Sequence, residues 1–157
     1  MSPFLHARRN HALEQATVAM LMERKHRRLR VAGLSDPLGF SLVSPASEAE
    51  VRHAVAQALA RLQAGESRLA LSELCGTSIL ATALLTAASV SLAGSRRGGG
   101  FRRLFSATLV AAVVAPSAGL WAQRTFTVEP DVGDLWVRGV RAVASARGLT
   151  LVRVTTS

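Results

Sequence analysis

The sequence predicts an α+β membrane protein, in which a transmembrane helical hairpin carries a small α+β extramembrane domain built from the N- and C-terminal parts. Three observations support this class. Two long segments in the middle of the chain contain no charged residue. The segments on either side combine helix-like and strand-like patterns. The chain has 19 Lys and Arg against 10 Asp and Glu, a net charge of +9, which favours an acidic partner such as anionic lipid.

The central region, 74–122, has the pattern of a membrane hairpin. Residues 74–94 and 104–122 each approach the roughly 20 apolar residues that a helix needs to cross a bilayer. The basic loop 95–103 is short enough to require an antiparallel pair. Two buried helices in a soluble protein are the alternative, but the rest of the chain is small for enclosing them. Neither span contains a charge, which argues against an ion or proton pathway.

Small residues recur every four positions on both spans, a spacing that lets two membrane helices approach closely. We expect these rows to mediate helix packing. They are Ala83, Ala87 and Ser91 in the first span, and Ala107, Ala111, Ala115 and Gly119 in the second.

The N-terminal part, 1–73, and the C-terminal tail, 123–157, are expected to form one small sheet with helices beside the membrane. A helix is expected over 5–27, and its part from Ala12 to Met22 is apolar nearly all round, so this part should be buried. A second helix should begin at Ser47, which forms a capping box with Glu50, and end at Gly65. Strand patterns occur at 29–35, 39–45, 68–72, 125–129, 135–143 and 149–156. In the last run Leu149, Leu151 and Val152 are expected to face inward and Arg153 outward.

The stretch NHALEQ, 10–15, resembles a zinc-peptidase motif with one changed residue. In H-x-x-E-H, two histidines bind zinc and the glutamate activates water. Here His11 and Glu14 are in place, but Gln15 replaces the second histidine. Glu66, Glu73 and Cys75 are candidate third ligands. Three interpretations stay open: hydrogen-bonded polar positions in a packed helix, a non-catalytic metal site, and a peptidase with Glu14 as its catalytic residue. We expect no cofactor, with zinc as the one alternative.

Two basic clusters are candidates for contact with lipid headgroups or partner subunits. A nucleic-acid partner is not expected, since no aromatic residue for base stacking lies between Phe4 and Phe40. The clusters comprise Arg24, Lys25, Arg27, Arg28 and Arg30 after the first helix, and Arg96, Arg97, Arg102 and Arg103 around the interhelical loop.

The order of motifs resembles a family of small bacterial two-span membrane proteins known only as a domain of unknown function. The motifs are RNHALEQATVAML, GLSDPLGFSLV, AVAQALARLQAGESRLAL and LCGTS, followed by the two hydrophobic spans. The family pattern has HALEH first and NCGTN later. His11, Glu14, Cys75, Gly76 and Thr77 match it, and Gln15, Leu74 and Ser78 depart from it. The resemblance implies a membrane location and no known activity.

These observations predict a non-catalytic accessory or structural subunit in a bacterial inner membrane, docked onto a larger membrane complex such as a respiratory or photosynthetic assembly. Its partners would be lipids and other membrane subunits. The alternatives are a degenerate membrane metallopeptidase-like protein and an anionic-lipid surface binder. We expect both termini in the cytoplasm, where the single cysteine would stay reduced.

Overall fold

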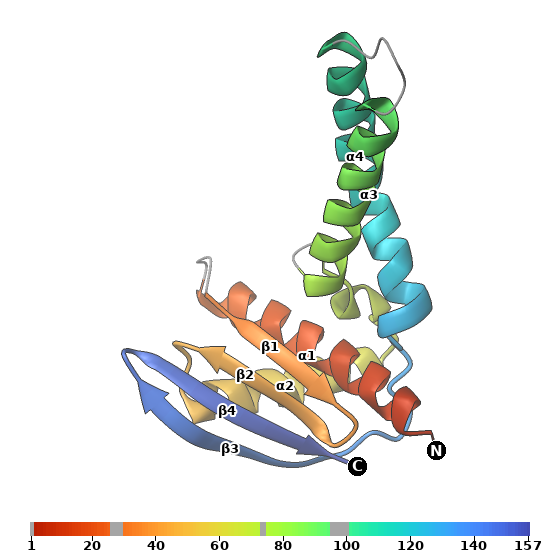
Figure 1. The fold of residues 1–157 in the computed structure, drawn as a ribbon. Helices are drawn as coiled ribbons and strands as arrows, with labels where there is room; N and C mark the ends of the chain where they lie inside the picture. The colour runs from red at the N-terminus through yellow and green to blue at the C-terminus, as the bar shows by residue number, and fades with distance from the viewer. Residues whose placement is uncertain (1, 26–29, 73–74, 95–100) are drawn as a thin grey trace. The chain divides into compact units, whose positions relative to one another are not determined.

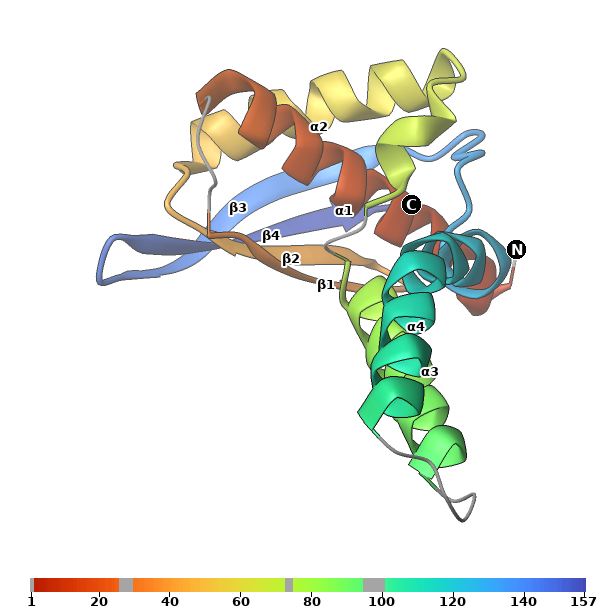
Figure 2. The same cartoon turned by 90° about the horizontal axis from the view of Figure 1, so that it is seen from above.

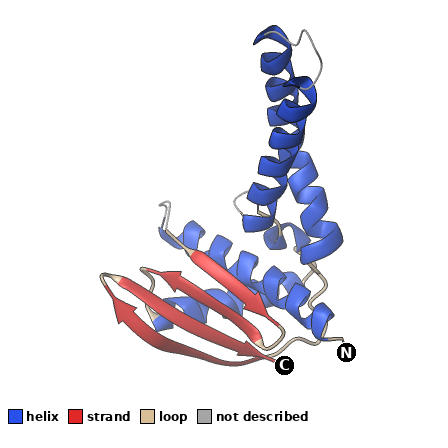
Figure 3. Cartoon of the chain, in the orientation of Figure 1, coloured by secondary structure: helices blue, strands red, loops and turns tan. Residues whose placement is uncertain are grey.

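The chain forms two compact units in the computed structural model, which describes residues 2–25, 30–72, 75–94 and 101–157. Unit 1 comprises Met1–Leu71 and Val128–Ser157, and unit 2 comprises Ser72–Thr127. Figure 3 shows helices and strands together in unit 1 and only helices in the drawn elements of unit 2. The predicted α+β class is therefore confirmed.

Unit 1 is built on a four-stranded antiparallel sheet with strand order β1-β2-β4-β3. The two ends of the chain meet where β2 pairs with β4, with Leu42 opposite Val152 and Phe40 opposite Val154. The prediction that N- and C-terminal strands share one sheet is thus confirmed. The strands are β1 (Ala32–Asp36), β2 (Gly39–Ser44), β3 (Val137–Ala146) and β4 (Leu149–Thr156).

Two helices, α1 (Pro3–Lys25) and α2 (Glu48–Gln63), cover one face of this sheet (Figures 1 and 2). The core lies between these layers. Alternate residues of the two central strands face the helices, and the buried side chains include Leu13, Leu21, Phe40, Leu42, Val51, Val55, Val152 and Val154.

Local sequence fixes both ends of α2. Ser47 Oγ accepts the backbone N–H of Glu50, and the Glu50 carboxylate accepts the N–H of Ser47, as the capping box predicts. The helix stops before Gly65, whose φ of +91° lies in the left-handed region that glycine adopts without strain. Both predicted boundaries are confirmed.

The outer edge of β3 is covered by side chains of α2. Glu48 Oε2 accepts the N–H of Ala142 at 2.8 Å, and Arg52 donates to the carbonyl of Val140 at 2.8 Å. Glu48 and Arg52 also pair with each other at 2.6 Å. These bonds occupy backbone groups that an edge strand would otherwise offer to another strand.

Two predicted strands are helical instead. Residues 68–72 overlap the 3₁₀-helix η1 (Ser67–Ala70), and 125–129 overlap the π-helix η2 (Gln123–Thr127), which continues α4. In η2 the Thr125 hydroxyl donates to the carbonyl of Trp121, four residues back, at 2.9 Å. This local bond supports a helical backbone where the β-prone composition indicated a strand.

Leu149 and Leu151 were expected to face inward, but Leu149 is exposed beside the β3–β4 turn and Leu151 is half-buried outside the core. Val152 faces the core, as predicted, together with Val154.

Unit 2 is a pair of helices, α3 (Gly76–Gly94) and α4 (Phe101–Ala122), that lie along each other (Figure 1). The Gln123 side chain holds residue 72 against the end of α4. Gln123 Nε2 donates to the carbonyl of Ser72, and the N–H of Ser72 donates to Gln123 Oε1 at 3.3 Å. Both ends of unit 2 are therefore tied together.

Candidate functional site

The residues singled out in NHALEQ lie on α1 against the β1–β2 hairpin. Glu14 is buried, and its Oε2 lies 3.2 Å from His11 Nδ1. Ser35 Oγ donates to the same Oε2. Gly33 lies directly beneath the carboxylate, because a Cβ at this position would come within 2.0 Å of Glu14 Oε1. The Glu14 carboxylate is thus surrounded by groups of α1 and β1.

Asn10 extends this polar cluster to the other end of the chain. Its Nδ2 donates to the carbonyl of Asp36 at 2.8 Å, and its Oδ1 accepts the hydroxyl proton of Thr156 at 2.7 Å. Asn10 is fully buried and Thr156 nearly so, so each satisfies the other away from water. The cluster therefore locks α1 onto β1 and β4.

The sequence analysis missed Asn10, Ser35 and Thr156 as members of this cluster. Asn10 and Ser35 both lie inside the quoted motifs, at NHALEQ and GLSDP. A polar residue within an apolar run can be recognised in the sequence. The hydrogen-bond partners of these residues could not be, because they are distant in sequence.

A metal site on this cluster would need a third protein ligand. Within the described residues, no group of three His, Cys, Asp or Glu side chains is placed to hold a metal ion. Among the three candidates, Glu66 pairs with Arg61 at 2.6 Å, Cys75 is buried just before α3, and Glu73 lies outside the described residues. His11 and Glu14 remain adjacent, so metal binding by this pair stays a prediction.

A second charged group lies on the opposite face of the sheet. Arg153 donates from both terminal nitrogens to Asp36, at 2.6 and 2.9 Å, in a bidentate pair. Hydrogen bonding by Arg153 holds the pKa of Asp36 below its ordinary value of 3.8, and Asp36 in turn raises the pKa of Arg153. The pair joins the β1–β2 turn to β4.

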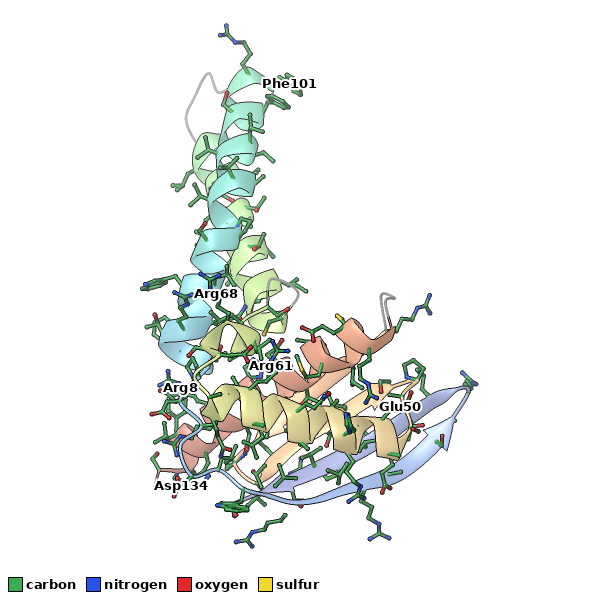
Figure 4. All side chains as sticks on the ribbon, turned by 180° about the vertical axis from the view of Figure 1, so that it is seen from behind. Arg8, Glu50, Arg61, Arg68, Phe101 and Asp134 are labelled. Carbon is green, nitrogen blue, oxygen red and sulfur yellow. The ribbon has the colours of Figure 1, made fainter. Side chains whose placement is uncertain are left out.

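Unit 2 presents a surface unlike that of unit 1. Figure 4 shows side chains projecting outward along both helices, with Phe101 at the loop end of α4. From Gly76 to Gly94, and from Leu104 to Gln123, the sequence has no charged residue. The exposed large apolar side chains here are Ile79, Leu80, Leu84, Leu85, Val90, Leu92, Phe101, Phe105, Leu109, Val110, Val113, Val114, Trp121 and Phe126.

By length and hydropathy, one helical stretch within the described residues, Phe105–Thr127, is able to cross a membrane, and Thr82–Leu92 is a shorter apolar stretch.

The predicted small-residue rows lie on different surfaces of the two helices. On α4, Ala111, Ala115 and Gly119 are buried and Ala107 is half-buried. On α3, the row Ala83, Ala87 and Ser91 is exposed, and the half-buried positions are Thr82, Thr86 and Ser89. The Thr86 and Ser89 hydroxyls donate to the carbonyls four residues back, each at 2.8 Å. The close approach therefore uses the alanine row of α4 and a hydroxyl-bearing surface of α3.

Comparison with known proteins gives a family match over most of both units. A family model described as a domain of unknown function, DUF6391, matches residues 6–140. The chain belongs to the DUF6391 family. An uncharacterized protein of Picosynechococcus sp. is 34% identical over 138 residues, which cover 78% of this chain and 66% of that protein. The chain thus spans slightly less than two thirds of this relative's length. No solved structure matches the chain.

In this DUF6391 chain the basic candidates divide into three groups. Arg24, Arg30 and Arg102 are exposed. Lys25 is the last residue of α1, and Arg103 lies in the first turn of α4. Arg27, Arg28, Arg96 and Arg97 fall outside the described residues.

Proposed function

We propose that this DUF6391 protein is an accessory subunit of a bacterial membrane complex, anchored by unit 2 as a transmembrane hairpin. The observation that carries the proposal is the surface of unit 2. Its large apolar side chains are exposed along two helices, and the sequence places no charge between 104 and 123. An apolar surface of this extent is unfavourable in water and suits a hydrocarbon environment.

The lengths of the two helices also fit a bilayer. α3 has 19 residues and α4 has 22, which correspond to about 29 and 33 Å at the usual helical rise. The hydrocarbon core of a bilayer is about 30 Å thick. Arg102 lies at the first turn of α4 and Arg124 just beyond its end, so these described charges fall near the two surfaces of such a layer.

Three hydroxyl side chains of the helices are compatible with lipid because they bond to their own backbone. Besides Thr86 and Ser89, Ser106 donates to the carbonyl of Arg102 at 2.8 Å. A hydroxyl that donates to the preceding turn has no donor left unsatisfied in a medium without water.

Unit 1 supports an accessory rather than a catalytic role. The polar groups that resembled a peptidase motif are engaged in bonds between elements of unit 1, with Glu14 held by Ser35 and His11. We propose that unit 1 lies on the cytoplasmic side of the inner membrane and contacts a larger assembly, for which a respiratory or photosynthetic complex is the suggested class.

The experiment is purification of the tagged full chain from its own host membranes in a mild detergent, followed by size separation and identification of co-migrating proteins. We expect the chain in a particle larger than itself, with stoichiometric membrane subunits. A chain that migrates alone at every detergent concentration would contradict the accessory role.

A metal-binding role is the second candidate, favoured by the 3.2 Å approach of His11 to Glu14. Zinc content of the purified chain separates the two proposals. The accessory role predicts far less than one zinc per chain, unaffected by His11→Ala. Stoichiometric zinc that this variant removes would support the metal site. Binding to anionic lipid through the basic residues 24–30 is a third proposal, and vesicle binding that ignores lipid charge would exclude it.

A further inference from the structure

Unit 1 exposes three large apolar side chains at one end of the sheet. Phe4, Leu38 and Trp136 are 65%, 71% and 71% exposed. Leu38 lies in the β1–β2 turn and its carbonyl accepts the N–H of Thr156. Trp136 exchanges two backbone hydrogen bonds with Ser157. The end of β4 therefore lies between Leu38 and Trp136.

Phe4 belongs to the same end of unit 1. Asn10 of α1 is bonded to Asp36 and Thr156 at this end of the sheet, and Phe4 lies six residues earlier on the same helix. At the usual rise, the first turn of α1 extends about 9 Å beyond Asn10. Figure 1 shows both chain termini at this end.

The chain enters unit 1 from unit 2 beside the same first turns of α1. Arg8 donates to the carbonyl of Val128 at 2.9 Å, and the N–H of Glu129 donates to the carbonyl of Arg8. Val128 directly follows Thr127, the last residue of unit 2. The polypeptide link from unit 2 therefore enters unit 1 at Arg8 of α1.

We propose that Phe4, Leu38 and Trp136 form an interfacial anchor that holds unit 1 on the headgroup layer of the membrane containing its own hairpin. This inference rests on the proposed membrane anchoring of unit 2. Tryptophan and other amphipathic rings favour the boundary between water and hydrocarbon. Arg8 lies over the Phe4 ring at 5.9 Å, so this ring contacts a cation on the same helix.

The anchor acts through apolar contact rather than net charge. Three ion pairs lie near it: Arg8 with Glu129 at 3.7 Å, Arg9 with Asp134 at 3.5 Å, and Asp36 with Arg153. Arg138, two residues after Trp136, is an exposed charge. Contact with the surface should therefore depend little on the anionic lipid content, in contrast to attachment through a basic cluster.

The test uses the two tryptophans of the chain, Trp121 and Trp136, in full-length protein reconstituted into phosphatidylcholine vesicles. In Trp121→Phe, fluorescence reports on Trp136 alone, and in Trp136→Phe it reports on Trp121 in the hairpin. Lipids with a quencher near the headgroup should quench both. In the Trp121→Phe background, Phe4→Ser/Leu38→Ser should lower Trp136 quenching about twofold or more. The matched control, Val143→Ser/Leu149→Ser at the other end of the sheet, should not.

The outcomes separate the two proposals. Quenching of Trp121 without quenching of Trp136 would overturn the anchor and leave the membrane hairpin standing. Absence of quenching at both positions would overturn the hairpin and the anchor together. Trp136 quenching that appears only with anionic lipid would overturn the charge-independent anchor in favour of basic attachment.

Discussion

At the scale of single residues, the polar positions of α1 act as connectors between distant parts of unit 1. Glu14 accepts from Ser35, and Asn10 bonds both Asp36 and Thr156. Asn10 and Thr156 are 146 positions apart, so no motif spacing could have paired them. The pattern H-x-x-E-Q does lie on one helix, as predicted, but the partners of its side chains depend on how β1 and β4 fold against that helix.

The contact between Gly33 and Glu14 gives the first prediction. Gly33→Ala places a Cβ where Glu14 Oε1 lies, and should lower the free energy of unfolding by about 2 kcal/mol through overpacking. Glu14→Ala should cost about as much, since Ser35 and His11 lose their acceptor. The double variant should be destabilised by about 1 kcal/mol or more less than the sum of the two single-variant costs.

Urea unfolding of the detergent-solubilised Trp121→Phe chain, followed by Trp136 fluorescence, measures this cycle. Strictly additive costs would show that Gly33 is required for a reason other than Glu14.

The Asp36–Arg153 pair predicts how stability depends on pH. Because hydrogen bonding by Arg153 depresses the pKa of Asp36 in the folded state, the pair stabilises fully above the ordinary value of 3.8 and less as pH falls through the lower folded value. Arg153→Met should therefore be less stable than the parent at neutral pH, and the difference should shrink below pH 3.8. Arg138→Met, which removes an exposed arginine of β3, is the control. A difference that stays constant through this range would contradict the assignment.

At the scale of elements, predictions succeeded where the signals were local. Ser47, Glu50 and Gly65 fix both ends of α2 within a few residues of themselves. The segment 125–129 has strand-forming composition, but its residues 125–127 are helical because they continue α4 and Thr125 bonds back to Trp121. Composition alone could not reveal that α4 persists beyond the apolar run.

The covered edge of β3 gives a prediction for α2. Glu48→Ala/Arg52→Ala should free the N–H of Ala142 and the carbonyl of Val140, lower stability, and increase self-association with protein concentration. Light scattering of the detergent-solubilised chain measures association. Gln57→Ala, which changes an exposed residue of the same helix, should alter neither stability nor self-association. Equal self-association of the two variants would contradict a protective role of Glu48 and Arg52.

The hairpin contact predicts a difference between neighbouring alanines of α4. Ala111 is buried and Ala112 is exposed. Ala111→Leu should separate the helices and cost about 1–3 kcal/mol, whereas Ala112→Leu should be tolerated. Helix loss during titration of mixed micelles with sodium dodecyl sulfate reports the difference. Equal midpoints for the two variants would exclude Ala111 from the helix contact.

At the scale of the whole molecule, the two units have different surfaces. Unit 1 buries its apolar residues between a sheet and two helices, as a water-soluble domain does. Unit 2 buries Ala111, Ala115 and Gly119 of α4, leaves Thr82, Thr86 and Ser89 of α3 half-buried, and exposes its large apolar residues. The two long uncharged runs in the sequence predicted the apolar helices of unit 2. The spacing of alanines did not predict which surface of α3 meets α4, because that depends on how the two helices pack.

The central claim is that the exposed surface of unit 2 faces lipid, and a matched pair of charge insertions tests it most directly. Val113 is 71% exposed on α4 and Val143 is 61% exposed on β3. An aspartate near the middle of a membrane helix costs about 2.5–3.5 kcal/mol, and one on a water-facing strand costs little. Carbonate extraction of membranes from producing cells should leave the parent and Val143→Asp in the pellet and release or deplete Val113→Asp. A soluble parent chain, or a Val113→Asp chain retained as fully as the parent, would contradict the account.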